Sequence, residues 1–142
     1  MRATRIALLV TSLVWLAGCA PANPSTSKRD ALADQVLSGK GDPFDVVGDR
    51  VGGRSFVFVV DPADVDGFVT PPAGYESGAV VQSDPSPADG TIPVAVYSDS
   101  DDASPQCAID VLRLADPSLY PYKMPDEVKS SEKALVQVRF VC

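Results

Sequence analysis

The chain has 142 residues, of which 45% are apolar and 22% charged, so its length and composition are those of one globular domain. Its formal charge is −7, and this acidity argues against nucleic acid as a partner, because nucleic-acid binding depends on lysine and arginine neutralising phosphates. The sequence contains no histidine, which removes the commonest general base and the usual ligand of transition metals. We therefore expect a protein that is not an enzyme.

The first 18 residues have the pattern of an export signal. Arg2 and Arg5 give the segment a basic start. The apolar run that follows, residues 6–16, is too short for a permanent membrane span, which needs about 20 apolar residues. The run ends in the sequence Leu16-Ala17-Gly18-Cys19, which resembles the lipobox of bacterial lipoproteins at all four positions.

This resemblance, which covers only residues 1–20, implies a lipid anchor. It implies transfer of diacylglycerol to the Cys19 thiol, cleavage before Cys19, and in many bacteria an acyl chain such as palmitate on the new amino group. Two or three acyl chains hold a protein stably on a membrane. The alternative is an ordinary secretory signal in which the cysteine occurs by chance.

The expected organisation is a signal peptide at 1–18, a lipidated N-terminus and linker at 19–27, and one exported β-rich domain at 28–142. Such a domain is extracytoplasmic and is held on the cell membrane, or on the outer membrane in a Gram-negative cell. Without the two arginines of the signal peptide, the exported part has a formal charge of −9, whereas the whole chain has −7. This charge disfavours direct binding to anionic lipid, so the membrane contact is expected through the lipid alone.

The exported part begins with a predicted short helix at 27–37. Ser27 is a suitable N-cap, and Leu32 and Val36 are spaced to share one face. Gly39 follows as a helix stop. The alternative is that this segment is a disordered extension of the linker.

The remainder predicts a mainly β fold. Strands are predicted at 54–60, 80–82, 92–97, 108–114 and 135–141, with a further short one at 44–47. The segment 54–60 is apolar on both faces, which is typical of a central strand, whereas Pro93 restricts 92–97 to an edge or to a late start. The expected architecture is a small antiparallel sheet or sandwich with a short N-terminal helix. An α+β arrangement is the alternative. Residues 125–129 predict one helical turn.

When Cys19 is assigned to lipid, two cysteines remain, Cys107 and Cys142. Export places both in a compartment where disulfides persist. We therefore predict a disulfide between them, the alternative being two free buried thiols. Cross-strand pairing supports the bridge. If Cys107 lies opposite Cys142 in an antiparallel pair, the apolar side chains of both strands share one face. The pairs that this register predicts are Ile109 with Phe140, Val111 with Val138, and Arg113 with Val136.

Two groups of aspartates follow predicted strands. Asp61, Asp64 and Asp66 follow the strand at 54–60, and Asp99, Asp101 and Asp102 follow the strand at 92–97. If the strands at 54–60, 80–82 and 92–97 form a meander, both groups emerge at one end of the sheet. Gathered carboxylates there predict a weak calcium site. The alternative is a solvated acidic surface, and no other cofactor is expected.

The functional hypothesis is a lipid-anchored envelope protein whose domain binds a ligand or has a structural role. Tyrosines in the predicted loops, Tyr75, Tyr120 and Tyr122, are candidate contacts for an envelope protein or a glycan. A first alternative is a surface-anchored enzyme inhibitor that uses the long loop at 115–133. A second is a hydrolase that works without histidine.

Overall fold

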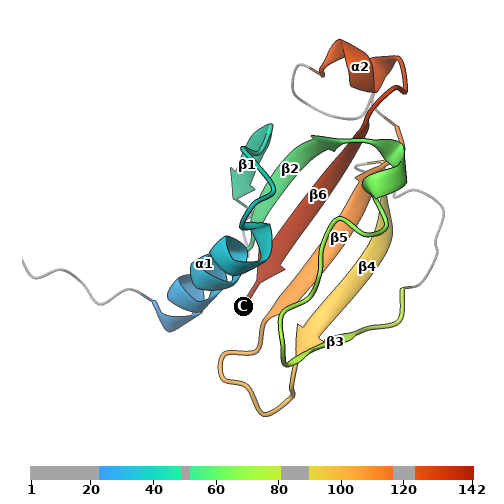
Figure 1. Ribbon diagram of the computed structural model, residues 1–142. Coiled ribbons are helices and arrows are strands. Elements are labelled where there is room, and N and C mark those ends of the chain that lie inside the picture. The colour runs from blue at the N-terminus through green and yellow to red at the C-terminus, as the bar shows by residue number, and fades with distance from the viewer. Residues whose placement is uncertain (1–22, 49–51, 81–89, 117–123) are drawn as a thin grey trace, which may run out of the picture.

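The computed structural model describes residues 23–48, 52–80, 90–116 and 124–142, which form one six-stranded antiparallel sheet with helix α1 packed on one face (Figure 1). The strands are β1 (Asp45–Gly48), β2 (Arg54–Val60), β3 (Tyr75–Ser77), β4 (Thr91–Asp99), β5 (Ala108–Leu114) and β6 (Ala134–Val141). Their spatial order is β1-β2-β6-β5-β4-β3. The predicted mainly β fold is confirmed, and within the described residues it is an open sheet rather than a sandwich.

The centre of the sheet is the pair β5 and β6. The predicted register is confirmed, with Ile109 opposite Phe140, Val111 opposite Val138, and Arg113 opposite Val136. The apolar side chains of both strands on the α1 face are at most 1% exposed, because α1 and the chain that follows β2 pack over them. The predicted strands at 54–60 and 108–114 have the observed bounds of β2 and β5.

A disulfide joins Cys107 and Cys142 at the ends of the central pair. Cys107 precedes β5 and Cys142 follows β6, so the bridge lies where the β5–β6 ladder ends. Cys107 is 1% exposed and belongs to the main apolar core. The predicted disulfide is therefore present, and it fixes the end of the sheet against which α1 begins.

Helix α1 (Pro24–Leu37) begins three residues earlier than the sequence predicted. The cap is Asn23 and not Ser27: the Asn23 side chain accepts a hydrogen bond from the Ser25 amide at 3.0 Å. Pro24 suits the first helical position, where no amide donor is needed. The segment 24–27, expected to belong to the linker, is therefore helical.

Different elements pack on the two faces of the sheet. On one face α1 packs beside the segment 61–74, whose first turn is the 3₁₀ helix η1 (Pro62–Asp64) and which crosses the sheet toward β3 (Figure 1). On the other face α2 (Asp126–Lys129) and Met124 cover Val57 and Leu135. The predicted helical turn at 125–129 is confirmed by α2.

The edge beyond β5 differs from the prediction. The strand predicted at 80–82 does not begin at Val80, and residues 81 and 82 lie outside the described residues. The strand next to β4 is instead β3, within a segment that was expected to be a loop. The expected late start is wrong, because β4 begins at Thr91. Strand β3 pairs only with residues 97–99, so among the described residues the part of β4 that contains Pro93 has β5 as its only neighbouring strand, as expected of an edge. Because the β4–β5 register shifts at Pro93, the ladder accommodates a residue that lacks an amide donor.

Replacing Cys107 and Cys142 together with alanine is expected to lower the free energy of unfolding by about 3.5–4 kcal/mol, because the bridge constrains the unfolded chain over a separation of 35 residues. Urea unfolding of the oxidised wild type and of the double variant measures the loss. Reductant should produce a similar loss in the wild type and none in the double variant. An unchanged unfolding free energy, or two alkylatable thiols besides Cys19 in the oxidised protein, would contradict the prediction.

Candidate functional site

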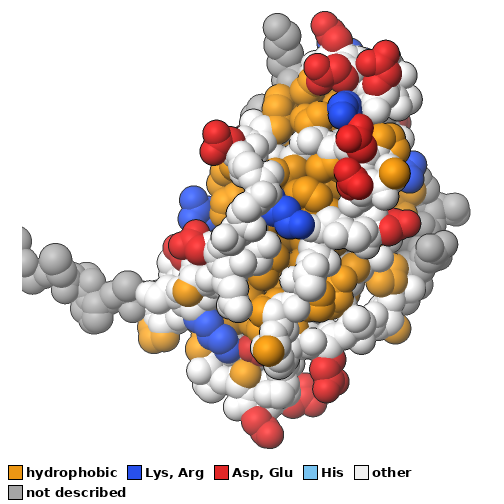
Figure 2. Space-filling view, in the orientation of Figure 1, with side chains coloured by type: hydrophobic (Ala, Val, Ile, Leu, Met, Phe, Trp, Pro, Cys, Tyr) orange, Lys and Arg blue, Asp and Glu red, His pale blue; other side chains and the backbone are white. Residues whose placement is uncertain are grey.

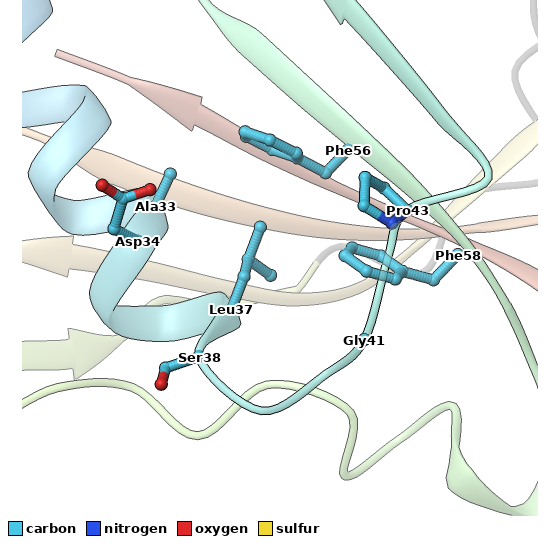
Figure 3. Close-up of a pocket in the computed structure, with 8 residues that line it drawn as sticks. All are labelled: Ala33, Asp34, Leu37, Ser38, Gly41, Pro43, Phe56 and Phe58. Carbon is cyan, nitrogen blue, oxygen red and sulfur yellow. The ribbon is translucent and has the colours of Figure 1, made fainter.

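A surface pocket of about 220 Å³ lies between the C-terminal half of α1 and strand β2 (Figure 3). Its helix side is formed by Ala33, Asp34, Leu37 and Ser38, its loop side by Gly41 and Pro43, and its floor by the rings of Phe56 and Phe58. The pocket exists because α1 ends at Leu37 and the chain then turns away through two glycines with positive φ, Gly39 and Gly41, before it reaches β1.

Neighbouring rings hold the floor in place. The Phe56 ring packs edge-on against Phe140, with 5.9 Å between ring centroids, and the Arg54 guanidinium lies 5.1 Å over its face. The Phe58 ring packs against Phe68 at 5.1 Å. Because Phe140 is fully buried, the floor of the pocket packs directly against the apolar core.

The apolar surface continues from the pocket onto β1. Val46 pairs with Phe56 in the β1–β2 register, so the two side chains share the face on which α1 packs. Val46 is 43% exposed and Phe44 is 39% exposed, and in the described part of the chain these are the exposed large hydrophobic residues. We call this continuous surface the α1–β1 groove. It consists of Leu37, Pro43, Phe44, Val46, Phe56 and Phe58.

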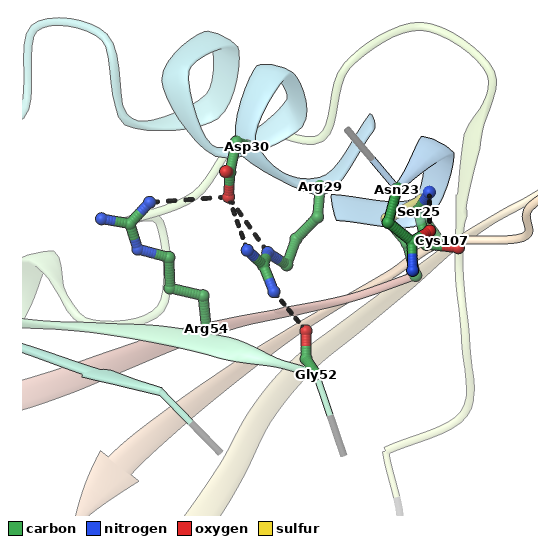
Figure 4. Close-up of polar contacts among 8 residues, drawn as sticks. Asn23, Ser25, Arg29, Asp30, Gly52, Arg54 and Cys107 are labelled. Carbon is green, nitrogen blue, oxygen red and sulfur yellow. Dashed lines mark hydrogen bonds and ion pairs between the residues drawn. A yellow bond between two sulfur atoms is a disulfide. The ribbon is translucent and has the colours of Figure 1, made fainter. Parts of the chain in front are cut away.

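The basic side chains beside the groove are already engaged (Figure 4). Asp30 accepts hydrogen bonds from Arg29 and forms an ion pair with Arg54, and Arg29 also donates to the Gly52 carbonyl. The hydrogen bond from Arg29 holds the pKa of the Asp30 carboxyl below its ordinary value, against a smaller opposing effect of burial. On the other side of the groove, Lys40 lies 5.0 Å over the Phe68 ring.

Two carboxylates at the groove have no such partner. Asp34 lines the pocket, and Asp42 lies in the loop between two of the lining residues. Both are exposed, and neither has an ion pair within the described ranges 23–48, 52–80, 90–116 and 124–142. The groove therefore has charges of both signs around it, because Arg54 lies over the Phe56 ring and shares the Asp30 carboxylate with Arg29.

The N-terminal half of α1 is tied to the sheet through Asp99. The Asp99 carboxylate, 8% exposed, pairs with Lys28 Nζ at 2.7 Å and accepts the Cys107 amide at 2.9 Å. It also interacts with the half-buried Tyr75. Burial raises the pKa of Asp99, but the hydrogen bonds from Lys28 and Cys107 outweigh it, so the net pKa lies below the ordinary value. Burial and the neighbouring Asp99 raise the pKa of Tyr75.

The six aspartates proposed as calcium ligands do not come together. Since β2 and β4 run in opposite directions, Asp61, Asp64 and Asp66 lie at one end of the sheet and Asp99, Asp101 and Asp102 lie at the other. Figure 2 shows acidic side chains gathered at both ends of this face. The predicted meander is therefore wrong. No group of three or more potential ligand side chains is arranged for a metal in the part of the chain that the structure describes.

Two of these aspartates are engaged in structural ion pairs. Asp61 pairs with Lys133 at 2.5 Å, and Asp99 pairs with Lys28 as described above. The Asp61 carboxylate raises the pKa of Lys133. The Asp99 contact is largely buried and ties α1 to the end of β4, whereas the Asp61–Lys133 pair is exposed on the surface; the sequence indicated neither pair.

Other sequence-predicted functional residues lie outside the described residues. Cys19 and its lipobox are among them, as are Tyr120 and Tyr122 and the middle of the loop at 115–133. Tyr75 is described, and it belongs to β3 and faces Asp99 rather than a loop. The later part of the proposed inhibitor loop contains the buried Met124 and α2.

The α1–β1 groove was not predicted from the sequence. The signal was present in the alternation of Phe44 and Val46, which placed two apolar side chains on one face of a short predicted strand. The sequence did not indicate that this face stays open beside the helix end, because that depends on where α1 crosses the sheet.

Comparison with known proteins found no matching family model, no similar curated protein and no similar solved structure. Among the described residues, no helix is long and apolar enough to cross a membrane.

Replacing Asp99 with asparagine is expected to destabilise the protein near neutral pH and to change its acid response. A carboxyl whose folded-state pKa is lowered stabilises the fold fully above its unfolded-state pKa of about 3.9, and this contribution is lost as the pH falls through the folded-state pKa. The stability difference between wild type and Asp99→Asn should therefore shrink below about pH 4.

Urea midpoints between pH 2.5 and pH 6 measure the effect. Asp102→Asn is the matched control, because Asp102 is exposed in the turn between β4 and β5, and it should keep the wild-type profile. A constant stability difference between wild type and Asp99→Asn over this range would contradict the role of the Asp99 charge.

Proposed function

We propose that the chain is a lipid-anchored protein of the bacterial cell envelope whose domain binds a partner through the α1–β1 groove. The disulfide between Cys107 and Cys142 carries the proposal, because structural disulfides are typical of proteins outside the cytoplasm. It uses the two cysteines that remain when Cys19 is assigned to lipid. The resemblance of residues 16–19 to a lipobox supports that assignment.

The position of α1 keeps the domain near its anchor. The helix begins at Pro24, so residues 20–23 are the whole tether between Cys19 and the folded domain. Four extended residues span at most about 13 Å. Because Lys28 fixes the start of α1 to Asp99, the tether leads directly into the packed domain. A lipid on Cys19 would thus hold the domain against the membrane surface.

The groove supports a binding role for the domain. It exposes Phe44 and Val46 beside a pocket whose floor consists of two aromatic rings. Clustered exposed apolar side chains with a polar rim are typical of sites that contact another molecule. A domain held on the membrane by lipid and exposing such a groove fits a binding role in the envelope.

Changing Cys19 to serine is expected to abolish lipidation, because serine lacks the thiol that accepts diacylglycerol. Metabolic labelling with an alkyne fatty acid in a bacterial host, followed by purification and detection, measures it. Ala20→Ser is the matched control, since it changes the neighbouring residue and keeps the four lipobox positions. Label on Cys19→Ser equal to that on wild type, or no label on wild type, would contradict the anchor.

A further inference from the structure

We infer that the end of the domain that carries the β4–β5 turn, residues 100–106, lies against the headgroups of a zwitterionic bilayer, and that α2 at the other end points away from it. This inference rests on the lipid anchor of the proposed function, and it adds the surface that meets the membrane. Three observations carry it: the contacts that fix the start of α1, the short tether, and the polar residues of the turn.

The start of α1 is fixed beside the β4–β5 turn. The Lys28 ammonium donates to the Asp99 carboxylate at 2.7 Å and to the Pro105 carbonyl at 2.5 Å, so one side chain ties the helix both to the end of β4 and to the turn. The disulfide closes the same end of the sheet, because Cys107 follows the turn directly. The start of α1, where the tether meets the domain, therefore lies at the turn end, whereas α2 lies at the opposite end (Figure 1).

The tether is short compared with the sheet. Residues 20–23 span at most about 13 Å, whereas the eight residues of β6, which run from the α2 end to the disulfide, span about 26 Å. The start of α1 therefore stays within about 13 Å of the lipid-bearing Cys19 in every orientation of the domain. The α2 end approaches the bilayer only if the domain lies on its side, so the turn is the surface nearest the headgroups.

The turn has the chemistry of a surface that contacts headgroups rather than the acyl interior. Burying an unpaired polar group in an apolar medium costs free energy, so polar side chains remain at the level of the headgroups. Residues 100–106 include two aspartates and no lysine or arginine, which favours a zwitterionic surface over an anionic one. The exposed residues of the turn are all polar: Ser100, Asp101, Asp102, Ser104 and Gln106.

Quenching of a fluorophore by the headgroups tests the inference. The full lipidated chain is reconstituted in phosphatidylcholine nanodiscs in which part of the lipid carries a nitroxide on its headgroup, and nanodiscs without nitroxide give the unquenched intensity. The fluorophore is attached to one added thiol, from Asp102→Cys or from Ser130→Cys, with the native disulfide kept oxidised. Both positions are exposed, one in the turn and the other at the end of α2. We expect quenching at position 102 to be several-fold stronger than at position 130.

A longer tether separates the geometry of the anchor from any affinity of the label for lipid. Inserting about 12 glycine and serine residues between Ala22 and Asn23 lengthens the reach by up to about 40 Å. The domain then approaches the headgroups with either end, so the difference between the two positions is expected to disappear. A difference that persists with the longer tether would come from the fluorophore or the turn itself, and it would overturn the tether as the cause of the orientation.

Mass spectrometry of the same samples reports the lipid on Cys19 independently of the quenching. Equal quenching at the two positions of the lipidated protein would mean that the domain lies on its side, and stronger quenching at position 130 would mean that α2 faces the bilayer. Either result would overturn the orientation and leave the anchor intact. A chain without lipid on Cys19 would contradict the anchor, and the orientation with it.

Discussion

The pairing of β5 with β6 determines what the other elements of the domain can contact. Apolar side chains alternate along both strands, and the register places Ile109, Val111, Val138 and Phe140 on a single face. Each is at most 1% exposed, and burying a side chain of this size is worth about 1.5–3 kcal/mol. The Cys107–Cys142 disulfide closes one end of this pair, and β2 and β4 add to its two sides.

The attachment of α1 follows from that central pair. The helix places Leu32, Ala33 and Val36 on the apolar face, and Lys28 pairs with an Asp99 that also accepts the Cys107 amide. One carboxylate thus links the helix, the end of β4 and the residue that carries the disulfide. Because the helix is fixed at this end and stops at Leu37, it leaves the Phe56 ring partly uncovered toward β1, while Phe58 beside it stays buried. The groove is therefore a consequence of how the helix is anchored.

Local features of this fold could be predicted from the sequence. The aromatic and β-branched run at 54–60 is β2. The alternation around Cys107 and Cys142 determined which side chains of the two strands share a face, and the predicted disulfide selected the observed register among those that keep these faces. The helix was predicted, but its start was misplaced because two capping residues, Asn23 and Ser27, lie within a few positions of each other. Local patterns identify an element more reliably than its first residue.

The arrangement of the strands could not be predicted in the same way. Strand β2 pairs with β6, about 80 residues further along the chain, and no short-range pattern indicates that partner. This insertion of β6 beside β2 reverses the direction of β4 relative to the predicted meander. It separates Asp61 from Asp99, and each then pairs with a lysine. The groove escaped prediction for the same reason, since its walls come from a helix, a loop and two strands that only the tertiary fold brings together.

Native-state hydrogen exchange resolved to individual amides tests most directly whether the β5–β6 pair is the framework of the domain. If this pair is the framework, the hydrogen-bonded amides of β5 and β6 exchange slowest, and only through global unfolding, whereas those of β1 and α1 exchange through local opening at lower free energy. Amides of β1 or α1 that exchange as slowly as those of β6 would contradict it.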